Sequence, residues 1–107
     1  MDKKEYIIDI NRLKEILYLK ITKDNKVFIM DTIQKIDNII DVLENDLYHG
    51  LALETRLGIV RKSFADLVIK KHITLTSEER LIWESFKEKE GNKAVKNSMF
   101  GYLLSFF

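Results

Sequence analysis

Two histidines, His49 and His72, are the side chains in this chain that are best suited by type to acid–base catalysis or metal binding. Neither has a partner ligand at a suitable spacing, and both stand at the ends of expected helices, a common structural position for histidine. The acidic side chains Asp37, Asp41 and Glu44 are typical of a solvated helix face. We therefore expect neither a metal site nor a catalytic pair.

Motifs of nucleotide-dependent and hydrolytic enzymes are absent from the sequence as well. It contains no phosphate-binding glycine loop, no GxGxxG dinucleotide motif, no nucleophile elbow and no HExxH zinc motif. It has no cysteine, which excludes disulfides, thiol nucleophiles and cysteine metal sites. The sequence predicts a protein that is not an enzyme and that uses no cofactor.

Basic side chains gather in the second half of the chain. Lys and Arg number 10 against 7 Asp and Glu over residues 51–107, and 8 against 10 over residues 1–50. The expected helix over residues 52–71 exposes a basic face, whose candidate partner-recognition residues are Arg56, Arg61, Lys62, Lys70 and Lys71. Such a face is also compatible with a small regulatory helical protein that binds DNA or a protein partner. We keep this as the alternative interpretation, because a net charge of +1 is low for a domain that reads a DNA groove.

The chain ends in an apolar and aromatic run, VKNSMFGYLLSFF. This run is too short to span a bilayer, which takes about 20 apolar residues. Two interpretations stay open for the tail over residues 92–107: its side chains cover the helices, or part of the set stays accessible and binds a membrane-associated partner. The candidate recognition residues in this region are Lys93, Lys96, Met99, Phe100, Tyr102, Leu103, Leu104, Phe106 and Phe107.

Hydrophobic spacing predicts four amphipathic helices that would position these residues, at about 3–19, 26–46, 52–71 and 77–89. In the first helix Asp9, Arg12 and Glu15 are expected to face solvent. Apolar residues recur at intervals of three and four in the first three helices: Tyr6, Ile10, Leu13 and Leu17; Ile29, Ile33, Ile36, Ile40, Leu43 and Leu47; and Leu53, Leu57, Val60, Phe64 and Leu67. In the fourth helix Trp83 and Phe86 share a stripe and are expected in the core.

Polar residues and glycines predict where these helices begin and end. Asn25 and its neighbours favour a turn after the first helix, and Gly50 is expected to end the second. Thr76 and Glu79 have the spacing of a capping box, which would start the fourth helix, and Gly91 is expected to stop it.

Short links between helices favour an all-α fold, an antiparallel four-helix bundle in a single domain over residues 1–107, with the apolar C-terminal tail packed on it. Charges interrupt every apolar run near the N-terminus, so no secretory signal is expected and the predicted location is the cytoplasm.

From about Leu53 onward the sequence resembles the bacteriocin immunity proteins of lactic acid bacteria, the pediocin-like and lactococcin A-like group. The similarity lies in RLGIVRKSFADLVIKKHITLTSEERLIWESFKE, where a basic amphipathic helix meets a Thr-x-x-Glu helix start, and in the ending GNKAVKNSMFGYLLSFF.

The resemblance implies a cytosolic antiparallel four-helix bundle whose C-terminal half determines which bacteriocin is resisted. It also implies a partner, the mannose phosphotransferase permease with bound bacteriocin. The immunity protein would bind this complex from the cytosolic side and block the pore, with peripheral contact to the inner membrane face.

Overall fold

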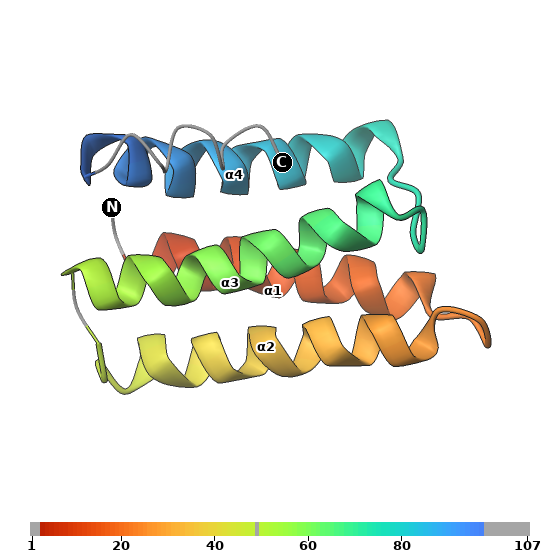
Figure 1. Cartoon of the computed structure of the whole chain (residues 1–107), viewed down its shortest axis with the longest axis horizontal. Coiled ribbons are helices and arrows are strands. Elements are labelled where there is room, and N and C mark those ends of the chain that lie inside the picture. The colour runs from red at the N-terminus through yellow and green to blue at the C-terminus, as the bar shows by residue number, and fades with distance from the viewer. Residues whose placement is uncertain (1–2, 49, 98–107) are drawn as a thin grey trace.

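The computed structural model describes the backbone of residues 3–48 and 50–97, and the side chains of residues 4–48 and 50–88. Within these ranges the chain forms four α-helices and no strand (Figure 1). The helices are α1 (Lys3–Lys20), α2 (Lys26–Glu44), α3 (Gly50–Ile69) and α4 (Ser77–Asn97). The all-α prediction is confirmed, and the apolar tail from residue 98 onward lies outside the described residues.

Each helix packs against two others. Helix α1 contacts α2 and α4, and α3 contacts the same two helices. Figure 1 shows the helices lying lengthwise beside one another, with α3 between α2 and α4 in this view. This packing is consistent with a four-helix bundle around one core.

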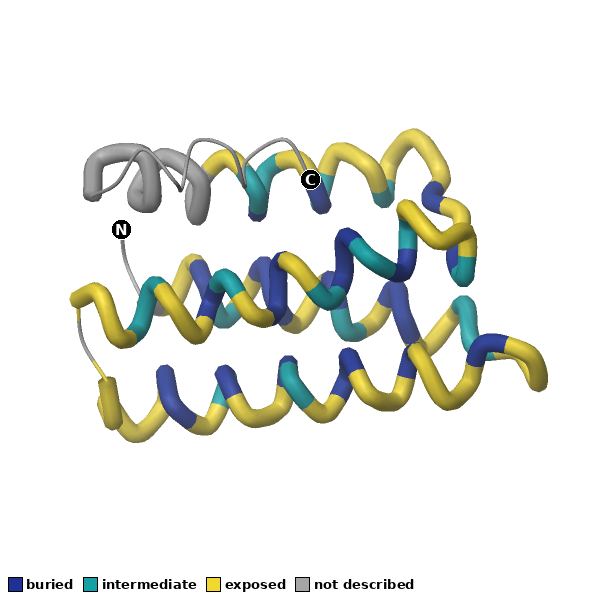
Figure 2. The backbone as a smooth tube through the Cα atoms, in the orientation of Figure 1, coloured by how far each residue is buried: buried dark blue, intermediate teal, exposed yellow. Residues whose placement is uncertain are grey.

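Buried residues recur along each helix, mostly on the side that faces the other helices (Figure 2). The predicted stripe of α1 is entirely buried, and α3 buries all of its predicted stripe except Leu53, which is half-buried. The ring of Trp83 lies between Phe64, at 4.5 Å, and Phe86, at 6.0 Å between ring centroids. Trp83 and Phe86 are therefore core residues, as the sequence predicts.

Three residues in the first half of the chain depart from the predicted pattern. Asp9, expected to face solvent, is only 4% exposed, because it follows Tyr6 by three residues and precedes Leu13 by four, which places it on the buried face of α1. Ile40 is half-buried, and Ile39 takes the inward position beside it. Leu47 is 56% exposed because α2 ends at Glu44, before that residue.

Helices α2 and α3 end in the same backbone motif. The chain enters the left-handed region at Asp46 (φ 51°) and at Lys71 (φ 60°), just past the last helical residues. The following residue then donates its N–H back into the helix, from Leu47 to the carbonyl of Val42 and from His72 to that of Leu67. These Schellman motifs end the helices. The prediction that Gly50 ends α2 is wrong, since Gly50 is the first residue of α3.

Helix α4 is longer than the sequence predicts. It continues to Asn97 and passes through Gly91, which was expected to stop it. A glycine inside a helix costs only about 1 kcal/mol relative to alanine, so flanking residues with high helix propensity, such as Lys89, Glu90 and Ala94, are sufficient to continue the helix. The segment after Asn92 is therefore helical as far as Asn97.

The predicted capping box at the start of α4 is confirmed. The backbone N–H of Thr76 donates to a Glu79 carboxylate oxygen at 2.8 Å, and the N–H of Glu79 donates to the Thr76 hydroxyl at 3.2 Å. The same carboxylate pairs with Lys20 at the end of α1, at 2.7 Å. Glu79 thus caps its own helix and connects it to α1.

Asn25 joins the two loops at one end of the molecule. Its side-chain oxygen accepts from the N–H of Thr22 at 2.6 Å, and its Nδ2 donates to the carbonyls of Lys20 and His72, both at 2.9 Å. Asn25 is also the N-cap residue of α2, yet its side chain makes no capping bond because it is used in these contacts. This buried amide holds the α1–α2 loop against the chain that follows α3.

Replacing this amide should destabilise the fold. Asn25→Asp keeps the shape and the oxygen that faces Thr22, but it sets an oxygen against two carbonyl oxygens. We expect the free energy of unfolding to fall by about 2–3 kcal/mol in urea titrations at pH 7. The matched control is Asn45→Asp, at an exposed asparagine whose Nδ2 bonds lie within its own helix end, and it should cost less than about 1 kcal/mol. Equal losses in the two variants would contradict the role given to Asn25.

The Lys20–Glu79 pair predicts a dependence of stability on pH. The hydrogen bond from the Lys20 ammonium, together with the one from the Thr76 N–H, holds the pKa of Glu79 below its ordinary value of 4.5. A lowered pKa in the folded state stabilises the fold above that ordinary value, and this contribution is lost as the pH falls through the folded-state pKa.

Glu79→Gln, which retains a capping oxygen, should therefore be less stable than the parent protein at pH 7. The difference in free energy of unfolding between the variant and the parent protein should become smaller at acidic pH, as measured by urea unfolding at a series of pH values. Glu78→Gln at the exposed neighbouring position is the control. The same pH-dependent difference in both variants would show that the pair with Lys20 is not its source.

Candidate functional site

An open groove of about 550 Å³ runs between α2 and α3. A smaller hollow of about 110 Å³ continues it toward the end of α2 and shares Lys35 and Ile59 with it. The residues that line the larger groove are Val27, Phe28, Asp31, Thr32, Lys35, Ile59, Lys62, Ser63, Asp66, Leu67, Lys70 and His72. Asn38, Ile39, Val42 and Arg56 complete the smaller one.

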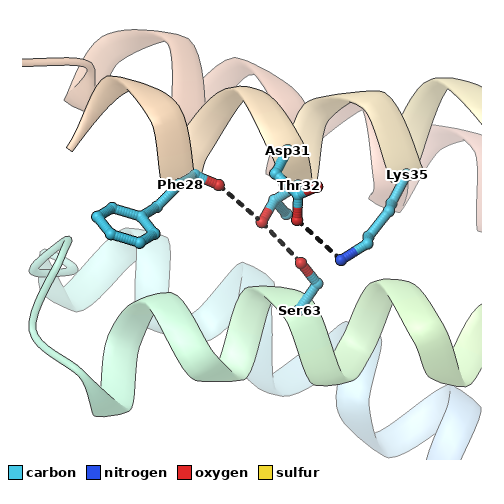
Figure 3. A network of polar contacts seen from close by, with 5 residues as sticks. All are labelled: Phe28, Asp31, Thr32, Lys35 and Ser63. Carbon is cyan, nitrogen blue, oxygen red and sulfur yellow. Dashed lines mark hydrogen bonds and ion pairs between the residues drawn. The ribbon is translucent and has the colours of Figure 1, made fainter.

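Two hydroxyl groups join the helices where they approach each other in this groove (Figure 3). The hydroxyl oxygens of Thr32 on α2 and Ser63 on α3 are 2.7 Å apart. Thr32 also donates to the carbonyl of Phe28 at 3.3 Å, one helical turn earlier, and is itself buried. If Thr32 uses its proton there, the proton of the cross-helix bond comes from Ser63. This bond adds a polar contact to the apolar packing of α2 against α3.

The charges along the groove are mainly basic. Among its described lining residues, four basic side chains, Lys35, Arg56, Lys62 and Lys70, stand against the carboxylates of Asp31 and Asp66. Lys35 pairs with Asp31 at 2.8 Å across one turn of α2 (Figure 3). The basic excess therefore lies on the α3 side.

Apolar side chains lie beside these charges. Phe28 and Ile59 are each about half exposed, at 49% and 47%. The Phe28 ring stacks on the imidazole of His72 with 4.0 Å between centroids and 14° between planes. At the other end the Arg56 guanidinium lies over the Tyr48 ring, 3.8 Å from its centroid. The groove thus offers both apolar contact and positive charge to a partner.

The structure brings together three of the predicted recognition residues. Arg56, Lys62 and Lys70 all line the groove or its continuation. Lys71 is exposed, but it is not among the lining residues, because the left-handed turn after α3 carries it past the groove.

The expected exposure of Arg61 is wrong. This residue is 1% exposed. It follows Leu57 by four residues and precedes Phe64 by three, which places it on the buried stripe of α3. The prediction relied on its charge, whereas the helical period determines which way it faces.

The remaining predicted recognition residues lie outside what the structure describes. Lys93 and Lys96 fall within α4, but their side chains are not among those described. The others lie beyond the described backbone: Met99, Phe100, Tyr102, Leu103, Leu104, Phe106 and Phe107.

Sequence reasoning missed Phe28, Thr32, Ile59 and Ser63. Two of them could have been found from the sequence. Thr32 and Ser63 are small polar residues next to core positions, and small residues of this kind allow two helices to approach closely. Phe28 and Ile59 lie beside the stripes, and their half exposure depends on the packing of α2 against α3.

Other kinds of site find no support in the described part of the chain. No group of three or more His, Asp or Glu side chains there could hold a metal ion. No described helix is both long and apolar enough to cross a lipid bilayer. Comparison with protein-family models, with curated proteins and with solved structures finds no match to this chain.

The cross-helix hydroxyl bond should contribute measurably to stability. Thr32→Val removes the hydroxyl at nearly constant shape and should cost about 1–2 kcal/mol in urea unfolding. Thr55→Val is the matched control, because the Thr55 hydroxyl also bonds to the carbonyl four residues earlier, at 2.9 Å, but is exposed. A Thr55→Val loss as large as that of Thr32→Val would contradict the contribution assigned to Ser63.

Proposed function

We propose that this protein is a bacteriocin immunity protein that acts by binding and not by catalysis. In this proposal it works on the cytosolic side of the producer cell's membrane. It binds the mannose phosphotransferase permease once a bacteriocin has occupied it, and it blocks the pore.

The observation that carries the proposal is the basic and apolar groove along α3. The resemblance to immunity proteins covers the half of the chain from about Leu53, and the basic excess of the groove and its continuation lies in this half, on α3 and at Lys70 just after it. Three residues selected from the sequence alone, Arg56, Lys62 and Lys70, line this surface with the half-exposed Ile59 between them.

The antiparallel bundle implied by the resemblance is also part of the proposal. It is supported by the short links at residues 45–49 and 70–76, which favour opposite directions in consecutive helices. The colour gradient in Figure 1 runs in opposite senses along α2 and α3, in keeping with that arrangement.

A groove between two helices suits a helical segment of the partner. An amphipathic helix can place apolar side chains against Phe28 and Ile59 while its acidic side chains approach Lys62 and Lys70. A cytosolic segment of the permease is the expected ligand. Protection then follows if the protein binds the closed form of the permease–bacteriocin complex more tightly than the open form, because this shifts the population toward the closed pore.

The C-terminal region completes the proposed recognition surface. Its basic and apolar residues are Lys93, Lys96, Met99, Phe100, Tyr102, Leu103, Leu104, Phe106 and Phe107. Arg61 is not part of this proposal, because its side chain is buried.

Charge reversal in the groove tests the proposal. A sensitive strain that produces the parent protein should survive a pediocin-like or lactococcin A-like bacteriocin, and the Lys62→Glu/Lys70→Glu variant should lose at least tenfold in the tolerated concentration. The reason is that two lysines that would attract acidic side chains of the partner are replaced by glutamates that repel them.

The control for this experiment is Arg12→Glu/Arg80→Glu, which makes the same charge change at exposed positions on α1 and α4. It should protect as well as the parent protein, and circular dichroism should show equal helicity in all three. Full protection by the groove variant, or no protection by the parent against any bacteriocin of this group, would contradict the proposal.

A further inference from the structure

The floor of the α2–α3 groove is made of two small side chains that lie between two larger ones. Thr32 and Ser63 face each other there, with 2.7 Å between their hydroxyl oxygens. Phe28 precedes Thr32 by one helical turn on α2, and Ile59 precedes Ser63 by one turn on α3. All four line the same groove, and Figure 3 shows Thr32 and Ser63 meeting between the two helices beside Phe28. We call these four residues the anchor site.

The two larger side chains of the anchor site lie toward opposite ends of the groove. Phe28 stacks on His72 at one end, whereas Ile59 shares the smaller hollow with Ile39 and Arg56 at the other. Phe28 and Ile59 are each about half exposed, so their free surfaces border the space above the two hydroxyls. A hole bounded by four side chains is the arrangement that accepts one side chain from a further helix.

The hydroxyl groups on the floor offer an acceptor but no free proton. Thr32 donates to the carbonyl of Phe28 at 3.3 Å, so Ser63 supplies the proton of the bond between the two hydroxyls. Ser63 is only half-buried, and an oxygen that donates its proton keeps two lone pairs. The anchor site therefore suits a side chain that is apolar along its length and carries a donor at its tip.

The charges around the anchor site indicate the character of the rest of the partner. Lys35 is neutralised by Asp31, at 2.8 Å. Lys62 and Lys70 form no ion pair with any described residue, and the groove sets them against the single carboxylate of Asp66. This basic excess is complementary to acidic side chains on a partner helix.

We propose that the anchor site binds one tyrosine-like side chain, an aromatic ring with a hydroxyl at its tip, from an acidic amphipathic helix. The ring packs between Phe28 and Ile59, and its hydroxyl donates to the oxygen of Ser63. This deepens the proposed function and rests on its assignment of the groove as the recognition surface. Ser63 determines which partner is accepted, because a larger side chain at this position would fill the hole.

Binding of synthetic peptides to the purified full chain tests the inference. The probe is a fluorescein-labelled peptide of Glu, Leu and Ala with one tyrosine at the centre of its apolar face. It is about four helical turns long, which matches the distance from Arg56 to Lys70 along the groove.

Changes at the central position of the peptide test the ring and its hydroxyl separately. In fluorescence anisotropy titrations, a peptide with alanine there should bind at least about tenfold more weakly than the tyrosine peptide. A peptide with phenylalanine should bind about fivefold more weakly, because it lacks the donor. Ser63→Ala should remove this difference between tyrosine and phenylalanine, since it removes the acceptor.

Two variants of the protein test the shape of the anchor site. Ser63→Leu fills the hole and should weaken binding of the tyrosine peptide at least about tenfold. Ile59→Ala removes one wall and should weaken it about fivefold. The matched control is Ile69→Ala, a position of similar exposure on the same helix that does not line the groove, and it should leave binding unchanged. Circular dichroism should show equal helicity in the three variants.

Several results would overturn the inference. They are no binding of the tyrosine peptide, equal binding of the tyrosine and alanine peptides, equal effects of Ile59→Ala and Ile69→Ala, and a difference between tyrosine and phenylalanine that persists in Ser63→Ala. Equally tight binding of a peptide with lysine in place of glutamate would also do so, because the partner would then not be acidic.

These outcomes are independent of the immunity assay, because peptide binding requires neither permease nor bacteriocin. Anchored peptide binding by a protein that gives no protection would leave the anchor site standing and contradict the proposed function. Full protection by Ser63→Leu would do the reverse.

Discussion

The hydrogen bonds of the Asn25 side chain are the constraint on which the α2–α3 groove depends. One amide connects the α1–α2 loop to the carbonyl of His72, which follows α3, and so fixes the start of α2 beside the end of α3. The stacking of Phe28 on His72 reinforces the same junction. At the neighbouring corner, the Lys20–Glu79 pair joins α1 to α4. Together these contacts bring four helix ends into one surface, from which the groove extends along α2 and α3.

Helical periodicity predicted most of the fold, because burial of an apolar stripe dominates the energetics of a small helical domain. The stripes of α1 and α3 and the Thr76–Glu79 capping box follow from local spacing alone. The errors arise where tertiary packing or backbone geometry decides. Arg61 and Asp9 are buried by position in spite of their charge, and Asp46 rather than a glycine takes the left-handed conformation that ends α2. The groove could be predicted only in part, since Phe28 on α2 comes to share a surface with Ile59 and Lys62 on α3 only when the two helices pack together.

We propose that the α2–α3 groove binds a permease only when a bacteriocin occupies it. The most direct measurement places a photo-crosslinking amino acid at Ile59, half exposed in the groove, with Ile8 on α1 as the control position of similar exposure. Cells would be irradiated with and without the bacteriocin. We expect a permease adduct from position 59 that depends on the bacteriocin, and none from position 8. An adduct that forms equally without the bacteriocin, or no permease adduct from position 59, would contradict it.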